Sequence, residues 1–305
     1  MKTKHRIILG TVAIVLATLP ASAATTAFTS IYAFGDSLTD VGNVNLATAG
    51  ALPGPGYFEG RYSNGPVWIE KLAVLMDVPI PTRSLTGGNN FAFAGAYTGT
   101  GGSVPTIPQQ IGMFTTGGRT FGPTDLVVLW AGANDFLLGG QTDPGIPVAN
   151  MTANISALAA AGAKTILLGN LPNLGDTPQL LATGNPTAIG GFRTLSQMFN
   201  AGLAGAVPTL EANLGIDIRL LDIYGIGEEL HTTPAVFGIT NLTEGALTSG
   251  HAADAAQYAY WDTVHPTNTV HNLFGDRAYL LVPEPGAMTL VWLFGSGLLL
   301  RRRRA

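Results

Sequence analysis

Short apolar runs alternate along the chain with longer segments in which apolar residues recur every three to four positions. The clearest run is Asp125–Trp130, D-L-V-V-L-W, which ends abruptly at A-G-A-N-D. A run this short, apolar on both faces and bounded by turn residues, is typical of a buried strand in a parallel sheet. Similar runs predict further strands at Ser30–Phe34, Asn89–Ala94, Lys164–Leu168 and Ile216–Ile223.

The segments between these runs have the spacing of amphipathic helices. The first begins near Pro66 and ends before Pro79, and its apolar residues recur at helical spacing from Trp68 to Met76. The same spacing predicts helices over Thr106–Phe114, Val148–Ala161, Phe192–Leu214 and Thr269–Leu281. Strands that alternate with helices predict an α/β fold with a mainly parallel sheet covered on both faces.

Three residues that could carry chemistry directly follow predicted strands: Ser37, Gly95 and Asn134. The carboxyl ends of parallel strands meet at one edge of the sheet, and binding sites collect there. We therefore expect these three residues to lie along the same edge.

The stretch Ile31–Asn43 gives Ser37 a special setting. Gly35 and Asp36 break the preceding strand, so that a serine follows on a tight turn. Such a turn holds the hydroxyl out of the sheet, as a nucleophile requires. An ordinary strand-to-helix turn, with Ser37 or Asp36 as the helix N-cap, explains the same pattern.

A D-x-x-H pair near the end of the body offers a base for that serine. Asp262 can accept a hydrogen bond from one ring nitrogen of His265, which leaves the other nitrogen free to take a proton from Ser37. Taken alone, such a pair is more often an ordinary surface hydrogen bond.

Gly95 and Asn134 suit the stabilisation of an oxyanion. Glycine lets a backbone N–H approach a substrate closely, and an asparagine amide supplies a second donor. Singly, each residue type is more typical of a turn or a cap.

Four blocks of sequence in this order resemble the GDSL family of lipases and esterases, within the SGNH hydrolase superfamily. F-G-D-S-L-T-D-V-G-N at 34–43 resembles the nucleophile block, and N-F-A-F-A-G at 90–95 resembles the glycine block. G-A-N-D at 132–135 resembles the asparagine block, and D-T-V-H-P at 262–266 the terminal block. Position 94 is alanine where some members have a second glycine.

The resemblance implies a catalytic triad of Ser37 as nucleophile, His265 as base and Asp262 as its orienting partner. It implies that the backbone N–H groups of Ser37 and Gly95 and the side chain of Asn134 form the oxyanion hole. It also implies a flavodoxin-like three-layer α/β/α sandwich that needs no metal or cofactor.

The resemblance leaves the substrate open, because family members include lipases, phospholipases, thioesterases and carbohydrate esterases. We expect an exported serine hydrolase that cleaves carboxylic esters, with a carbohydrate acetylesterase or a catalytically silent binding protein as alternatives. Three predicted loops, Val41–Arg61, Gly99–Thr120 and His231–Gln257, would shape its pockets. Aromatic residues that could line an acyl groove, although core packing is their commoner use, are Tyr57, Phe58, Tyr97, Tyr258, Tyr260 and Trp261.

Both ends of the chain carry the pattern of export signals. A basic start, the apolar run Ile7–Leu19 and a small-residue site predict a signal peptide over residues 1–23. Residues 282–305 combine Pro-Glu-Pro, an uncharged segment at 287–300 and four arginines. This tail resembles the PEP-CTERM sorting signal of Gram-negative bacteria, which implies an exosortase-type processing enzyme and delivery to the cell surface or extracellular matrix. A plain membrane anchor is the alternative.

The hydrolase domain is then predicted over residues 24–281, with membrane contact only through the terminal segments. Seven of the fifteen basic residues but only one of the nineteen acidic residues lie in the tails, so the body has a net charge of −10. Such a body repels phosphate backbones, which excludes nucleic acid as a partner. The chain has no cysteine, so thiol catalysis, thiolate metal sites and disulfides are excluded.

Overall fold

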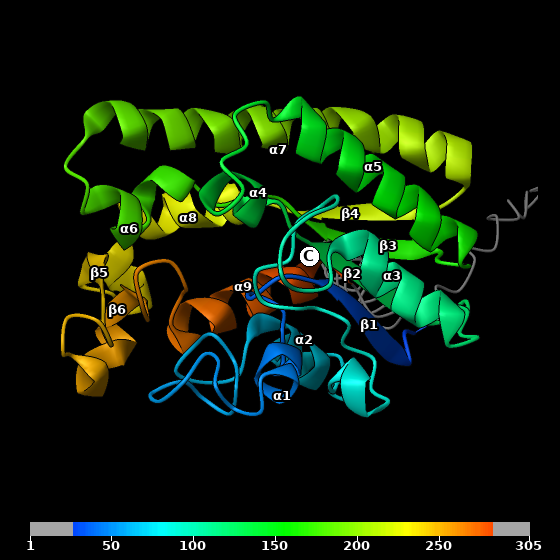
Figure 1. Cartoon of the computed structure of the whole chain (residues 1–305), viewed down its shortest axis with the longest axis horizontal. Coiled ribbons are helices and arrows are strands. Elements are labelled where there is room, and N and C mark those ends of the chain that lie inside the picture. The colour runs from blue at the N-terminus through cyan, green and yellow to red at the C-terminus, as the bar shows by residue number, and fades with distance from the viewer. Residues whose placement is uncertain (1–26, 283–305) are drawn as a thin grey trace, which may run out of the picture.

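A four-stranded parallel sheet forms the centre of the protein (Figure 1). The computed structural model describes residues 27–282. The strands lie side by side in chain order, and Ile31 pairs with Leu126 in the first ladder. Their bounds are β1 Ser30–Gly35, β2 Asp125–Trp130, β3 Thr165–Gly169 and β4 Asp217–Leu221.

The segment 89–93 lies along the outer edge of β1 and extends the sheet by pairing in parallel. Phe91 N donates to Ala33 O at 2.7 Å, and Phe93 N donates to Gly35 O at 3.1 Å. The spatial order is therefore that of a flavodoxin-like sheet, as predicted, with its topological switch point beside β1. This segment does not form the full predicted strand, because the Asn43 amide occupies the carbonyls of Asn90 and Ala92 on its other side.

Helices cover both faces of the sheet and complete the predicted three-layer α/β/α arrangement. In Figure 1, α2 (Trp68–Leu75) and α9 (Asn268–Leu281) lie below the sheet. The helices that pack on the other face are α3 (Ile107–Thr116), α5 (Gly145–Ala160) and α7 (Pro186–Leu214), of which α7 lies at the top of Figure 1.

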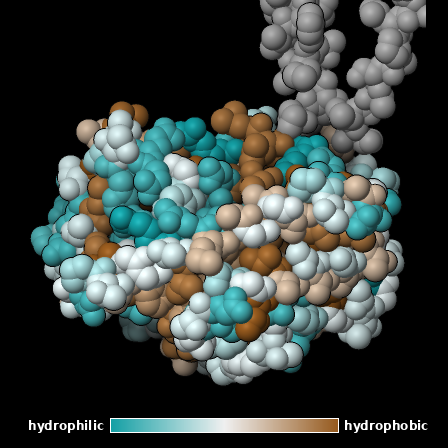
Figure 2. Space-filling view, turned by 90° about the horizontal axis from the view of Figure 1, so that it is seen from above, coloured by the Kyte–Doolittle hydropathy of each residue, from teal (hydrophilic) through white to brown (hydrophobic). Residues whose placement is uncertain are grey.

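Strand β2 shows how the sequence pattern builds two cores. Leu126, Val128 and Trp130 point to the core shared with α2 and α9, whereas Val127 and Leu129 point to the core shared with α5 and α7. Successive side chains of a strand face opposite sides, so a strand buried on both faces must be apolar throughout. The outer face of α5 and α7 carries mixed hydrophilic and hydrophobic side chains (Figure 2).

The predicted helices all form, and their ends differ by a few residues. The largest difference is at α7, which begins at Pro186 rather than Phe192. The Asn185 side chain accepts hydrogen bonds from Thr187 N and Ala188 N, and proline suits the first helical position. The first part of this helix was not predicted, because proline, glycine and asparagine, which are typical of loops, cluster before Phe192.

Several short elements were not predicted, because they lie in segments that the sequence pattern marks as loops. The predicted loop Val41–Arg61 contains α1 (Asn43–Ala47), and the predicted strand Ile216–Ile223 ends at Leu221, where α8 (Ile223–Thr232) follows. The predicted loop His231–Gln257 contains β5, whereas the loop Gly99–Thr120 contains only the predicted helix, α3, among its regular elements. The remaining elements are α4 Ala133–Leu137, α6 Pro178–Leu181, β5 Asn241–Gly245, β6 Tyr258–Tyr260 and 3-10 turns at Ser84–Thr86, Leu174–Asp176, Pro234–Phe237 and Ala252–Gln257.

The predicted signal peptide lies outside the described residues, and so does the predicted sorting tail apart from Val282. Within residues 27–282, no helix combines the length and the apolar character needed to cross a bilayer.

Candidate active site

Ser37 lies on the turn that leaves the carboxyl end of β1. At Gly35 the chain passes so close to β2 that an added Cβ would lie 2.6 Å from the Trp130 carbonyl oxygen, and only glycine fits. The Asp36 carboxylate then accepts a hydrogen bond from Leu38 N at 3.1 Å and closes the turn. No helix begins at Ser37, since α1 starts at Asn43, so Asp36 caps a turn rather than a helix.

A continuous chain of hydrogen bonds joins Ser37, His265 and Asp262. His265 Nε2 lies 2.9 Å from Ser37 Oγ, and His265 Nδ1 lies 2.7 Å from Asp262 Oδ2. The other carboxylate oxygen, Oδ1, accepts from the backbone N–H groups of Val264 and His265 at 2.8 and 2.7 Å. The structure therefore brings together the three residues predicted as a triad.

The carboxylate of Asp262 is held in its ionised form. Burial by itself would raise the pKa of Asp262, but the charge of His265 and hydrogen bonds from His265 and Tyr57 lower it to about 2. An ionised partner on Nδ1 favours the tautomer in which Nε2 is free to accept a proton from Ser37.

The predicted oxyanion donors lie around the same turn. Asn134, in α4, lines the same pocket as Ser37, and one of its amide hydrogens is used by Ala96 O at 3.2 Å, which leaves the other available. Gly95 has a φ of 86°, which favours glycine. Among residues 27–282, the backbone N–H groups of Ser37 and Gly95 donate to no protein acceptor.

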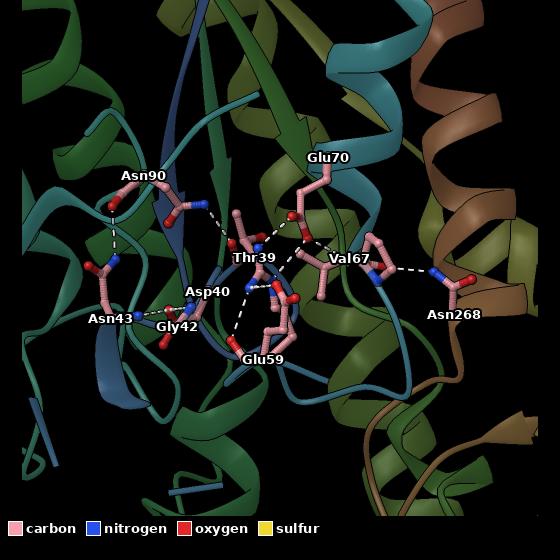
Figure 3. Close-up of polar contacts among 11 residues, drawn as sticks. Thr39, Asp40, Gly42, Asn43, Glu59, Val67, Glu70, Asn90 and Asn268 are labelled. Carbon is pink, nitrogen blue, oxygen red and sulfur yellow. Dashed lines mark hydrogen bonds and ion pairs between the residues drawn. The ribbon is translucent and has the colours of Figure 1, made fainter. Parts of the chain in front are cut away.

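Gly95 is positioned by a buried side-chain network that the sequence analysis did not assign (Figure 3). Asp40 accepts from Asn43 N at 2.6 Å and from Ala94 N, next to Gly95, at 3.0 Å. The Asn90 amide donates in turn to Thr39 O at 2.7 Å. These residues lie inside the nucleophile and glycine blocks, so their positions in these two motifs could have indicated the network from the sequence.

The sequence model of the GDSL-like lipase/acylhydrolase family matches residues 31–278. The chain belongs to this family. The predicted resemblance to GDSL lipases and esterases is thereby confirmed.

This GDSL family chain is similar to curated proteins of bacteria. It is 36% identical over 188 residues to the phosphatidylcholine-sterol acyltransferase of Aeromonas hydrophila, covering 58% of this chain and 54% of that protein. It is 27% identical over 269 residues to the thermolabile hemolysin of Vibrio parahaemolyticus, covering 81% of this chain and 62% of that protein. The chain thus spans between half and two thirds of the length of these relatives.

Among solved structures, a carbohydrate acetylesterase from Sinorhizobium meliloti is similar at 15% identity and a TM-score of 0.47, covering 83% of this chain and 96% of that one. A putative arylesterase from Agrobacterium tumefaciens is similar at 18% identity and a TM-score of 0.48, covering 84% and 98%.

In this GDSL family chain, Ser37, Asn134 and His265 line an apolar pocket. One wall comes from α8, which was not predicted, because its glycines at 225 and 227 and its acidic residues mask the apolar face. Apolar side chains from the turn after β1, from β2 and from α4, α8 and α9 dominate the lining: Leu38, Trp130, Leu137, Ile226, Leu230 and Phe274.

Of the six aromatic residues that could line an acyl groove, five pack elsewhere, which is the commoner use of such residues. Tyr260 does line the apolar pocket. Tyr57 packs with Tyr258 and Trp261 in a separate small cluster. Phe58 lies against the guanidinium of Arg61, and Tyr97 lines a different pocket beside Asp135.

The site contains a second carboxyl group, that of Asp36, whose pKa is raised, whereas the pKa of Asp262 is lowered. Burial raises the pKa of Asp36 to about 7, although the hydrogen bond from Leu38 and the charge of His265 lower it. The two carboxyls that interact with His265 therefore titrate far apart, that of Asp262 in acid and that of Asp36 near neutrality. Among residues 27–282, no group of three His, Asp or Glu side chains is arranged to hold a metal ion.

Proposed function

We propose that this protein is an ester hydrolase that cleaves carboxylic esters through an acyl-Ser37 intermediate. The observation that carries the proposal is the Ser37–His265–Asp262 hydrogen-bonded chain in the wall of an apolar pocket. Membership of the GDSL-like lipase/acylhydrolase family supports the same class of reaction.

In the acylation step, Ser37 Oγ attacks the ester carbonyl carbon while His265 Nε2 takes the hydroxyl proton. The carbonyl oxygen becomes an oxyanion that the Ser37 and Gly95 N–H groups and the Asn134 amide stabilise, at roughly 3–4 kcal/mol for each donor. His265 then returns the proton to the alkoxide, and the alcohol leaves.

Deacylation repeats these steps with water as the nucleophile. His265 takes a proton from water, hydroxide adds to the acyl carbon, and the proton passes to Ser37 Oγ as the carboxylic acid leaves. Throughout, Asp262 stabilises the transient imidazolium and keeps the ring in the productive tautomer without itself being protonated.

The lining of the pocket favours an ester with an apolar acyl chain. Ile226, Leu230 and Phe274 offer such a chain burial but offer few partners to the hydroxyl groups of a sugar. The name of the Aeromonas relative refers to phosphatidylcholine, a phospholipid whose acyl chains are apolar. We therefore favour a lipid-type ester over an acetylated sugar.

A graded panel of chromogenic esters tests this preference. We expect kcat/KM to rise roughly fourfold for each methylene added beyond acetyl until the pocket is filled, because each buried methylene contributes about 0.8 kcal/mol. Faster hydrolysis of acetylated sugars than of octanoyl esters would contradict the assignment of a lipid-type substrate.

A variant of α8 sharpens this test. Gly227 lines the pocket, and a Cβ added there would meet no atom within 4 Å. Gly227→Leu therefore adds bulk to the pocket, and its Cβ clashes with no neighbouring atom. We expect kcat/KM for the octanoyl ester to fall about tenfold while that for the acetyl ester stays within twofold. Gly205→Leu is the matched control, since Gly205 lies on the exposed side of α7 and is equally unobstructed.

We further propose that the protein is exported and delivered to the cell surface or extracellular matrix of a Gram-negative bacterium. The supporting observations are the signal-peptide pattern of residues 1–23 and the sorting pattern of residues 282–305. An exosortase-type enzyme would process the tail, which could hold the protein in the inner membrane until then through residues 287–300. N-terminal sequencing and intact mass of protein from the cell surface should show cleavage after Ala23 and loss of the arginine end, and an uncleaved chain would contradict both assignments.

A further inference from the structure

Tyr57 contacts Asp262 of the proposed triad, although the proposed mechanism gives Tyr57 no role. Its hydroxyl donates a hydrogen bond of 2.7 Å to Asp262 Oδ2, the same oxygen that His265 Nδ1 contacts at 2.7 Å. With two backbone N–H groups on Oδ1, the carboxylate is held by four donors. Tyr57 and Asp262 are 205 residues apart in sequence, so nothing local brings them together.

The loop between α1 and α2 is shaped to deliver this hydroxyl. Gly56 has a φ of 90°, and a Cβ there would lie 3.1 Å from Leu247, so glycine lets the loop approach the segment before β6. The Tyr57 ring then packs edge-on against Trp261, with 6.4 Å between ring centroids. Phe58 N donates to Ser63 O at 2.9 Å and closes the loop behind it.

The same loop is fastened to the protein on its α2 side. Arg61 forms a bidentate ion pair with the buried Glu70, at 2.7 Å to Oε1 and 3.3 Å to Oε2. Glu70 also accepts from Val67 N at 2.9 Å, so its carboxylate joins the loop to the start of α2 (Figure 3). Bidentate pairs of this kind restrict orientation as well as distance.

The loop also holds the chain that follows His265. Ser63 Oγ donates to Pro266 O at 3.2 Å, and Asn64 Oδ1 accepts from Asn268 N at 2.7 Å. The Asn268 amide donates back to Pro66 O at 2.6 Å, a contact visible in Figure 3. The loop thus contacts the terminal block before, beside and after its histidine.

We propose that Tyr57 is a positioning residue that fixes the plane of the Asp262 carboxylate and weakens its pull on the His265 ring. This inference rests on the proposed hydrolase function. A hydrogen bond from a phenol spreads part of the negative charge of Oδ2, and an acceptor that already serves one donor binds a second less strongly. The base is thereby kept neutral, and ready to accept the serine proton, at a lower pH than without Tyr57.

Tyr57 can keep this role across the working range of pH. Burial, followed by the hydrogen bond to Asp262, raises the pKa of Tyr57 well above its ordinary value, so the phenol stays a donor. The other titratable groups that face His265 are Asp36 on the nucleophile turn, Tyr62 on the same loop, with its ring centroid 4.9 Å away, and the buried His271 on α9. His231 lines the same pocket from α8.

Replacement of Tyr57 by phenylalanine tests the inference, because the ring and its packing on Trp261 are kept while the donor is lost. The acid limb of kcat/KM against pH should move upward by roughly 0.5–1 unit, and kcat should fall about threefold to tenfold. KM for an octanoyl ester should be unchanged, since Tyr57 does not line the apolar pocket. An unmoved acid limb with kcat within twofold of the parent would overturn the proposal.

Tyr258→Phe is the matched control. Tyr258 belongs to the same aromatic cluster, and within residues 27–282 its hydroxyl makes no hydrogen bond, so the variant should keep the parental pH profile. A titration of the His265 ring by NMR tests the role of Tyr57 separately from the proposed hydrolase function, because it needs no turnover of substrate. A parent that hydrolyses no ester defeats the proposed function, whereas a His265 midpoint that is equal in the parent and in Tyr57→Phe defeats the role of Tyr57.

Discussion

Replacement of Ser37 by alanine is expected to lower kcat for ester hydrolysis by about a millionfold, the largest effect of any single change in this protein. The variant lacks the oxygen that attacks the ester, and His265 Nε2 loses its 2.9 Å partner. The residual rate would come from the oxyanion donors and from binding in the apolar pocket, which the substitution leaves in place.

Steady-state hydrolysis of an octanoyl ester measures this effect, and mass spectrometry after treatment with a fluorophosphonate locates the nucleophile. The parent should gain one adduct on Ser37, and the variant should gain none. Ser156→Ala serves as the control, because it removes a half-buried serine hydroxyl whose hydrogen bond in the described part of the chain is to Thr152 O, within α5. A Ser37→Ala protein that hydrolyses ester at the parental rate would refute the acyl-enzyme mechanism.

Asp262→Asn is expected to lower kcat about ten-thousandfold while the site keeps its shape. The backbone N–H groups of Val264 and His265 require an oxygen at the position of Oδ1, so the new amide nitrogen must take the place of Oδ2. That nitrogen then donates to His265 Nδ1. The ring is driven into the tautomer whose Nε2 carries a hydrogen and cannot accept the proton of Ser37.

The same substitution should also reduce stability in a pH-dependent way. The pKa of Asp262 falls from an ordinary 3.8 to about 2 on folding, so its carboxylate stabilises the native state above pH 4, and this contribution is lost as the pH falls toward 2. The shift corresponds to about 2 kcal/mol at neutral pH. Urea unfolding at pH 7 and pH 2.5 should show a deficit for Asp262→Asn that shrinks in acid.

The chain contains a matched control for this experiment. Asp254 lies three residues after His251, at 3.7 Å from its ring, but both side chains are exposed. Asp254→Asn should therefore leave kcat unchanged and have little effect on unfolding, because exposed pairs contribute little. A loss of activity in Asp254→Asn equal to that in Asp262→Asn would contradict the assignment of Asp262.

The regular parts of the fold could be predicted because their signals are periodic and local. Strand β2 has the predicted bounds Asp125–Trp130, since a run buried on both faces must be apolar at each position. Helix α8 escaped prediction because its apolar residues Ile223, Ile226 and Leu230 are separated by two glycines and two glutamates.

The residues of the site also differ in whether the sequence could predict their roles. Ser37 and His265 lie in blocks that resemble those of the GDSL family, so their roles could be predicted from the sequence. The structure brings the two side chains together. Tyr57 carries no such signal, since a tyrosine in a loop rich in glycine is as compatible with packing as with a hydrogen bond to a residue 205 positions away. The lining of the pocket could not be predicted because it combines aliphatic side chains from α4, α8, α9 and several loops with the aromatic side chains of Trp130, Tyr260 and Phe274.

The distance along the chain between Ser37 and His265 has a consequence for when the protein becomes reactive. Ser37 lies on the turn after β1, and its proposed base, His265, lies 228 residues later, just before α9. A chain that is still being made carries the hydroxyl for most of its synthesis without a group to deprotonate it. Closing so long a separation is also slow, because distant contacts form after local ones. If the proposed mechanism holds, the order of residues delays ester hydrolysis until the segment that carries His265 has been made and folded against the turn of Ser37.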